Sequence, residues 1–206
     1  MPRTRVKICG ITRVSDARIA YALGADAIGL VFYKPSPRNI SVDQAVEIAR
    51  AVGPFISRVG LFVNPSAEDV EQVIRQVGLD RLQFHGDESE AFCRQFGLPY
   101  IKALRAKPGV DFQATVDQYP SAMGVLLDSY KPGVAGGTGE VFDWQSIPTA
   151  LRSSIILAGG LNAGNVSEAI RAIRPAAVDV SGGVEESPGI KSADKIEAFI
   201  EAVNRE

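Results

Sequence analysis

Lys7 and Cys9 are the first residues along the chain whose types and spacing suggest chemistry. They alternate with Val6 and Ile8 in a stretch that predicts a buried strand, so both polar side chains are expected on one face, with Cys9 at the carboxyl end. A thiolate can act as a base, and a nearby cation such as Lys7 lowers the pKa of a thiol. Two alternatives stay open: Cys9 as a small core residue, and Lys7 in an ion pair with an acidic neighbour.

Polar side chains recur at the ends of other apolar stretches. Two of them share a face of Arg81–His85, two share a face of the stretch around Ala177–Val180, and one ends Gly124–Asp128. One polar strand end is common, but a series of them is hard to explain as core packing, so they predict a shared site. The residues are Gln83, His85, Asp128, Asp179 and Ser181, together with Arg38 in the loop Ser36-Pro37-Arg38.

Two glycine pairs follow the last two predicted strands. They are Gly159-Gly160 and Gly182-Gly183. Glycine allows the backbone to approach a ligand closely, and exposed backbone N–H groups can bind phosphate without Lys or Arg. The alternative is that both pairs only form tight turns, but pairs at two adjacent strand ends favour a phosphate site.

Eight short apolar stretches rich in Val, Ile, Leu and Phe can form the strands that position these residues. Strands that alternate with helices pair in parallel through right-handed crossovers, and eight such units predict a closed, compact (β/α)8 TIM barrel. An open doubly wound sheet is the rival, but Cys9-Gly10-Ile11-Thr12 does not fit its G-x-G-x-x-G fingerprint. The predicted strands are Val6–Cys9, Ala27–Phe32, Ser57–Phe62, Arg81–His85, Tyr100–Leu104, Gly124–Asp128, Ile155–Ala158 and Ala177–Val180.

Amphipathic segments lie between the strands. Ser15, Ser41 and Ser66 are each expected to cap the start of a helix. No linker or shift in composition divides the chain, so residues 1–206 are expected to form one domain. The predicted helices are Ser15–Leu23, Val42–Ala51, Ala67–Val77, Glu88–Phe96, Phe112–Gln118, Phe142–Ala150, Asn165–Ile173 and Ala193–Val203.

Composition excludes several classes of function. A net charge of −2 with scattered Lys and Arg gives no basic surface for nucleic acid. A single histidine excludes a histidine-rich metal site, and two cysteines do not suggest a disulfide framework. No apolar leader or spanning segment precedes the first strand, so we expect no membrane association and a cytoplasmic location.

Nearly the whole chain, in order, resembles the phosphoribosylanthranilate isomerase family, a tryptophan-biosynthesis barrel. No single motif is decisive, but the ordered set is highly specific. The matching segments are Lys7-Ile8-Cys9-Gly10-Ile11-Thr12, Gly24-Ala25-Asp26-Ala27-Ile28-Gly29, Ser36-Pro37-Arg38, Val59-Gly60-Leu61-Phe62-Val63-Asn64, Gln83-Phe84-His85-Gly86-Asp87-Glu88, Leu127-Asp128-Ser129, Gly136-Gly137-Thr138-Gly139, Phe142-Asp143-Trp144, Leu157-Ala158-Gly159-Gly160-Leu161, Val178-Asp179-Val180-Ser181 and Gly183-Val184-Glu185.

The resemblance implies roles for individual residues. It makes Cys9 the general base, Asp128 the general acid and Arg38 a residue of the substrate site, with a supporting role for Asp179. His85 is expected either to position substrate or to bond a loop carbonyl. One departure is Gly182, where the family commonly has a serine, so one hydroxyl contact to phosphate is lost. The second cysteine, Cys93, is expected to be structural.

The implied reaction converts N-(5-phosphoribosyl)anthranilate into the 1-deoxyribulose 5-phosphate product, an Amadori rearrangement. The substrate nitrogen is the electron sink, so no cofactor and no metal are expected. The protein is expected to be a monomer or a homodimer. Two alternatives remain: another phosphosugar barrel enzyme such as an indole-glycerol-phosphate synthase, and a non-catalytic barrel that senses a phosphorylated ligand. The synthase would carry catalytic Lys and Glu residues and a longer N-terminal extension.

Overall fold

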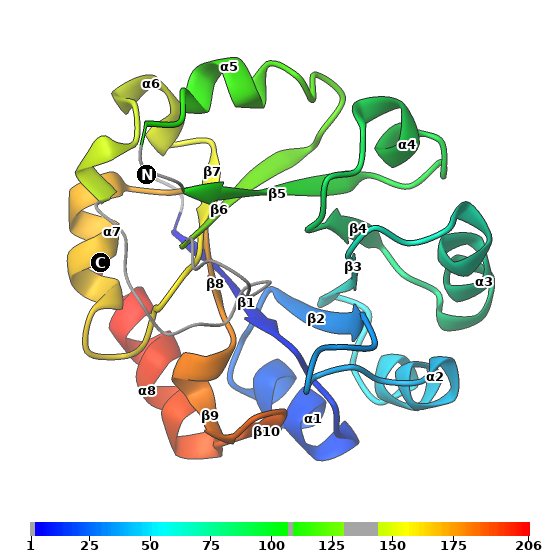
Figure 1. Ribbon diagram of the computed structural model, residues 1–206. Helices are drawn as coiled ribbons and strands as arrows, with labels where there is room; N and C mark the ends of the chain where they lie inside the picture. The colour runs from blue at the N-terminus through cyan, green and yellow to red at the C-terminus, as the bar shows by residue number, and fades with distance from the viewer. Residues whose placement is uncertain (1–2, 107–108, 130–143) are drawn as a thin grey trace.

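The computed structural model describes residues 3–106, 109–129 and 144–206, and its parallel strands close into an eight-stranded barrel (Figure 1). Each strand pairs with the next one along the chain, and β8 pairs with β1 to complete the ring. The predicted (β/α)8 barrel is therefore confirmed. The strands are β1 (Arg5–Cys9), β2 (Ala27–Phe32), β3 (Ser57–Phe62), β4 (Arg81–Phe84), β5 (Tyr100–Ala106), β6 (Gly124–Ser129), β7 (Ile155–Leu157) and β8 (Ala177–Val180).

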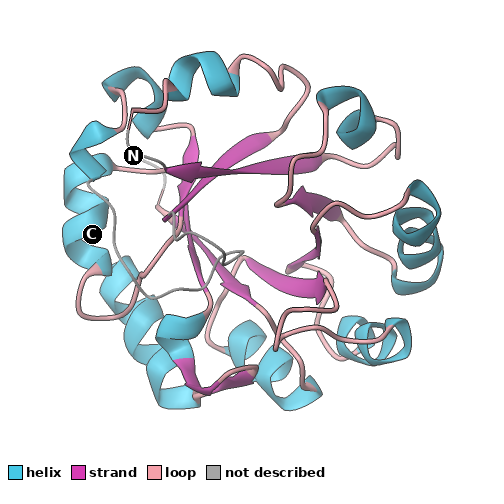
Figure 2. Cartoon of the chain, viewed as in Figure 1, coloured by secondary structure: helices cyan, strands magenta, loops and turns pink. Residues whose placement is uncertain are grey.

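Helices cover the outside of the barrel (Figure 2). A short antiparallel hairpin, β9 (Glu185–Ser187) with β10 (Ile190–Lys191), lies between β8 and the last helix. The helices are α1 (Val14–Ala22), α2 (Val42–Arg50), α3 (Ala67–Val77), α4 (Glu90–Arg94), α5 (Phe112–Val116), α6 (Thr149–Arg152), α7 (Val166–Ile173) and α8 (Ala193–Asn204), with single 3₁₀ turns η1 (Trp144–Ser146) and η2 (Gly182–Val184).

Strand alternation divides the buried side chains into two layers. Val6 and Ile8 belong to the main core between the barrel and its helices, whereas Cys9 belongs to a separate small cluster on the other face. A third cluster of small and apolar side chains fills the barrel interior below Cys9. It consists of Val59, Ile101, Ala103, Leu126 and Ala158. The inward positions are therefore apolar in the middle of the barrel and polar at its carboxyl end.

Capping serines begin two of the helices as expected. The side chains of Ser41 and Ser66 accept hydrogen bonds from the backbone N–H groups of Gln44 and Asp69. The prediction for Ser15 is wrong, because α1 starts one residue earlier at Val14 and its N-cap residue makes no side-chain capping bond.

The helix predicted over Phe142–Ala150 is also wrong in part. Phe142 and Asp143 lie outside the described residues, and the rest divides into η1 and α6 on either side of Ile147 and Pro148. Proline lacks the N–H of a continuous helix and disfavours helical geometry in the residue before it. Gly136–Gly139 of the family motif also lie outside the described residues.

The loop between β4 and α4 is tied to the barrel by a buried ion pair. Lys102 on β5 lies 2.7 Å from a carboxylate oxygen of Glu88 and donates to the carbonyl of Gly86 at 2.6 Å. Glu88 in turn accepts from the backbone N–H of Asn64 after β3. This network holds the loop next to His85 in place. The helix α4 begins at Glu90 and not at Glu88 as predicted, because Ser89 is its N-cap and accepts a hydrogen bond from the backbone N–H of Phe92.

None of the helices in the described ranges is both long and apolar enough to cross a membrane.

Candidate active site

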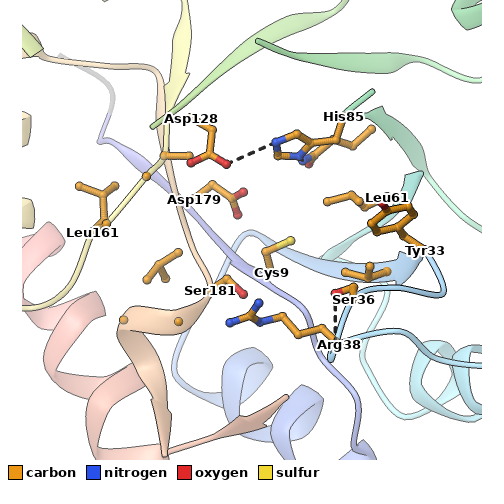
Figure 3. A pocket seen from close by; sticks show the side chains of 18 of the residues that line it. Cys9, Tyr33, Ser36, Arg38, Leu61, His85, Asp128, Leu161, Asp179 and Ser181 are labelled. Atoms are coloured by element: carbon orange, nitrogen blue, oxygen red, sulfur yellow. Dashed lines mark hydrogen bonds and ion pairs between the residues drawn. The ribbon is translucent and has the colours of Figure 1, made fainter. Parts of the chain in front are cut away.

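A pocket at the carboxyl end of the barrel strands brings together nearly all the predicted site residues (Figure 3). Its volume is about 220 Å³, enough for part or all of a small molecule. Lys7 is the one predicted residue that does not line it. The predicted residues that do are Cys9, Arg38, Gln83, His85, Asp128, Gly159, Gly160, Asp179, Ser181, Gly182 and Gly183.

The sequence analysis missed an apolar wall of the same pocket. Four side chains from the ends of β2 and β3 and the residues that follow make this wall: Val31, Tyr33, Leu61 and Val63. Ligand pockets are commonly lined by such residues with a few placed polar groups. Their signal in the sequence was weak, because apolar residues at strand ends also suit an ordinary core.

Lys7 forms a buried ion pair with Asp179 beneath the pocket. Its Nζ lies 2.9 Å from Asp179 Oδ1, and both residues are under 10% exposed. Burial alone would lower the pKa of Lys7, but Asp179 and Cys9 outweigh it and raise that pKa. Lys7 therefore stays charged. The sequence left open whether Lys7 lies beside the Cys9 thiol or pairs with an acidic neighbour. The structure shows the ion pair, and the Lys7 ammonium also lies beside the thiol.

The environment of Cys9 does not produce a low-pKa thiol. Burial raises the pKa of Cys9; Lys7 opposes this shift, but Asp179 adds to it. Lys7 thus lowers the pKa of the thiol as expected, but burial and Asp179 outweigh it, so the net shift is upward. Gly29 on β2 provides the room for this pair, because a Cβ there would lie 2.7 Å from Cys9 Sγ and 3.2 Å from Lys7 Nζ.

Arg38 is held by a second charged network at the edge of the pocket. Its Nε and Nη2 donate to the two carboxylate oxygens of Glu185 at 2.8 and 2.7 Å, and Lys191 Nζ lies 2.8 Å from the same carboxylate. Glu185 is mostly buried, yet Arg38 and Lys191 hold the pKa of its carboxyl below the ordinary value. Two cations against one carboxylate leave a net positive charge for an anionic ligand. The sequence indicated Glu185 only through the family motif, and Lys191 not at all.

The loop that carries Arg38 is also supported locally. The backbone N–H of Arg38 donates to Ser36 Oγ at 3.1 Å (Figure 3). Gly10, with a φ of +76°, allows the arginine to lie across it, because a Cβ there would be 2.4 Å from Arg38 Cδ.

His85 and Asp128 approach each other across the pocket from β4 and β6. His85 Nε2 lies 3.3 Å from Asp128 Oδ2 (Figure 3). His85 Nδ1 lies 3.3 Å from the side-chain nitrogen of Gln83. The expectation that His85 would bond a loop carbonyl finds no support among its described contacts. Asp128 also faces Asp179, and its charge adds to the burial that raises the pKa of Asp179.

The two glycine loops pack directly on each other. Gly159 and Gly160 both have positive φ, at 83° and 67°. Gly183 lies in η2, and a Cβ on it would be only 1.9 Å from the carbonyl oxygen of Leu161. Both loops line the pocket, so their backbones can close around one end of a ligand.

Cys93 lies apart from this pocket. It is fully buried in α4, and burial raises the pKa of its thiol to about 12. Such a thiol is inert, as expected of a structural cysteine. No group of three or more His, Cys, Asp or Glu side chains in the described ranges is placed to hold a metal ion.

Comparison with known proteins agrees with the resemblance. Residues 6–202 match the family model described as N-(5'-phosphoribosyl)anthranilate (PRA) isomerase. The N-(5'-phosphoribosyl)anthranilate isomerase of Pseudomonas paraeruginosa is 56% identical over 203 residues, which cover 98% of this chain and 96% of the relative. That of Pseudomonas fluorescens is 57% identical over 205 residues, covering 100% and 98%. This chain belongs to the phosphoribosylanthranilate isomerase family.

Solved structures of phosphoribosylanthranilate isomerases share the fold. The Thermotoga maritima structure has a TM-score of 0.89 and 40% identity, and covers 98% of this chain and 100% of the other. A second isomerase structure, in complex with reduced 1-(o-carboxyphenylamino)-1-deoxyribulose 5-phosphate, has a TM-score of 0.86 and 39% identity with the same coverage. The chain is therefore an isomerase of tryptophan biosynthesis.

Proposed function

We propose that this protein converts N-(5-phosphoribosyl)anthranilate into 1-(2-carboxyphenylamino)-1-deoxyribulose 5-phosphate, with Asp128 as general acid and Cys9 as general base. The observation that carries the proposal is the position of these two side chains, which line one pocket from β6 and β1. The relative in complex with a reduced form of that product supports the choice of ligand.

Ring opening is the first step. Asp128 donates a proton to the ring oxygen of the ribose, the bond between this oxygen and C1 breaks, and the anthranilate nitrogen lone pair forms a Schiff base with C1. The positive Schiff base makes the proton on C2 acidic. Asp128 is left as a carboxylate, and His85 Nε2 lies 3.3 Å from its Oδ2.

Proton transfer from C2 is the second step. Cys9 accepts this proton as a thiolate, and the resulting thiol then donates it to C1, while the 2-hydroxyl proton returns to Asp128 as the ketone forms. Both groups end in their starting states, so the cycle balances. The ammonium of Lys7 beside the thiol stabilises the thiolate, and because burial raises the pKa of Cys9, the reactive fraction increases as the pH rises.

The remaining groups bind and orient the substrate. We assign the phosphate to the paired loops at Gly159-Gly160 and Ser181-Gly182-Gly183, whose close packing brings two backbones to one place. Arg38, held side-on by Glu185, offers its remaining nitrogen to an anionic group of the substrate. The apolar wall of Val31, Tyr33, Leu61 and Val63 suits the aromatic ring.

Turnover by the purified protein tests this function directly. The fluorescence of phosphoribosylanthranilate should be lost when the protein is added, with formation of the ketose product. A protein that binds a phosphorylated product analogue without turnover would instead support the non-catalytic alternative. Turnover of a different phosphosugar alone would support another barrel enzyme.

The oligomeric state and location stay predictions. A Thermotoga maritima relative, 38% identical, is described as monomers generated from a dimeric isomerase. We expect a monomer or a homodimer for this chain as well, which its elution volume in size-exclusion chromatography decides. A cytoplasmic location is likewise expected.

A further inference from the structure

Two buried polar atoms on β4 and directly after it have no partner. Among the described residues, only three buried side-chain nitrogen or oxygen atoms lack a hydrogen bond, and two of these are Gln83 Oε1 and His85 Nε2. A buried polar group without a partner costs free energy, so such a group at a pocket calls for a reason. The two residues share an inward face of the strand and contact each other.

The contact between Gln83 and His85 determines where the imidazole carries its proton. The amide nitrogen of Gln83 lies 3.3 Å from His85 Nδ1, and because an amide nitrogen can only donate, this contact is a hydrogen bond when Nδ1 is the unprotonated nitrogen. The proton of the neutral ring is then on Nε2, which lies 3.3 Å from Asp128 Oδ2. If the amide of Gln83 were turned the other way, its oxygen would accept a hydrogen bond from His85 Nδ1–H. The unprotonated Nε2 would then direct its lone pair at Asp128.

We propose that Gln83 is a positioning residue that holds His85 in the Nε2–H tautomer and so directs a hydrogen-bond donor at Asp128. The consequence for the reaction rests on the proposed function: a donor at this place stabilises the carboxylate that forms when Asp128 protonates the ring oxygen. The donor need not bond fully before then, since catalytic hydrogen bonds are often long without substrate.

The surroundings of Gln83 fit this role. Gln83 lines the pocket but is 0% exposed, and its described side-chain contact is with His85. Its Cα partners in the barrel are Leu61 on β3 and Ile101 on β5, whose side chains offer no hydrogen bond. A glutamine selected only for packing would gain nothing here over an apolar side chain.

Other charged groups also face Asp128 and contribute to any pH dependence. Asp179 on β8 interacts electrostatically with both Asp128 and His85, and Asp179 is itself paired with Lys7 on β1. On the neighbouring β5, Arg105 is its Cα partner in the register. For this reason the test reads the histidine itself and does not rely on a pH–rate profile alone.

Nitrogen-15 NMR of the ligand-free enzyme tests the tautomer, and assignment is direct because the chain has a single histidine. With ¹⁵N-labelled histidine, we expect one protonated and one unprotonated ring nitrogen at neutral pH, with the proton on Nε2. In Gln83→Glu the carboxylate accepts from Nδ1, so Nδ1 should become protonated. Gln83→Met, of similar volume, should leave a mixture of tautomers. The exposed Gln76→Met is the matched control and should match the parent.

Kinetics then connect the tautomer to the reaction. Both Gln83 variants should lower kcat at least about 10-fold, as the loss of a residue that orients another typically does, with KM changed less than about threefold. A proton on Nδ1 in the parent, or an unchanged Nε2–H tautomer in Gln83→Glu, would overturn the inference. Full kcat in both variants would overturn the link to Asp128. The NMR result does not depend on turnover, so failure of the proposed reaction in the parent would be distinguished from failure of the tautomer assignment.

Discussion

Gly183→Ala should weaken phosphate binding by forcing the two glycine loops apart. The added Cβ would lie 1.9 Å from the carbonyl oxygen of Leu161, whereas real Cβ atoms essentially never approach closer than 3.0 Å. The loops must therefore separate by about 1 Å, and the atom in the way belongs to the backbone and cannot rotate aside. Gly183 has no positive φ, so the effect comes from contacts with Leu161 and Asn162 and not from backbone strain.

The expected loss follows from that displacement. Misplacing a binding group by 1 Å can cost about 10²-fold, which corresponds to about 2.7 kcal/mol. We expect the Kd of a phosphorylated product analogue to rise about 100-fold, and KM for the substrate to rise with it. Overpacking of this kind typically also costs about 1–3 kcal/mol of stability, so the protein should still fold. Gly160 is a poorer test, because at its φ of 67° any side chain also strains the backbone.

Isothermal titration calorimetry with the product analogue provides the measurement. Gly124→Ala at the start of β6 is the matched control, since its Cβ would lie 3.6 Å from Ile156 Cδ1, an ordinary contact. The control should bind as the parent does. If folded Gly183→Ala binds the analogue as tightly as the parent, the phosphate does not lie between these loops and the assignment is wrong.

Three further predictions address the acid, the base and the ion pair beneath them. Cys9→Ser and Asp128→Asn should each lower kcat at least about 10²-fold, and the double variant should lose less than the product of the two losses. The control Cys93→Ser should keep the parent kcat. An inactive Cys93→Ser together with an active Cys9→Ser would place the base on Cys93. The rate of Cys9 alkylation by iodoacetamide should increase with pH, with a midpoint above that of an ordinary thiol, because burial raises the pKa of Cys9. Bound product analogue should protect Cys9 from alkylation. A midpoint below the ordinary value would contradict the raised pKa. Asp179→Asn leaves the Lys7 ammonium buried without its partner and should lower the free energy of unfolding by about 3–5 kcal/mol, measured by urea denaturation; an unchanged midpoint would show that Lys7 does not need the pair.

Local rules in the sequence were sufficient for the architecture. The alternation of apolar stretches with amphipathic segments predicted the barrel, because each strand and each helix is recognised within a few residues. The two-residue period of a strand placed Lys7 with Cys9, and Gln83 with His85, on the inward face. Strand ends that share one edge of a parallel barrel then had to meet, so most of the polar residues of the pocket could be predicted without knowing any distance, but its apolar wall was missed.

Two helix boundaries were predicted wrongly because a local signal was overlooked. The predicted helix around Pro148 divides in two at a residue that was visible in the sequence, so that error came from reading amphipathic periodicity without its breaker. The start of α4 was also visible locally, because Ser89 caps the helix, while Glu88 before it pairs with Lys102 from the next strand.

Only the tertiary structure decided the partners and charge states within the site. From the sequence, Lys7 could have stabilised the thiolate or paired with an acidic residue. Closure of the barrel brings Asp179 from 172 residues away, because β1 pairs with β8 in a register that places Lys7 opposite Asp179. The same closure brings Glu185 to Arg38 across 147 residues. Burial of Cys9 raises its pKa although a cation lies beside it. A residue's type and its place on a strand follow from local sequence, but desolvation and electrostatic partners depend on which distant strands are adjacent, and those are properties of the closed barrel.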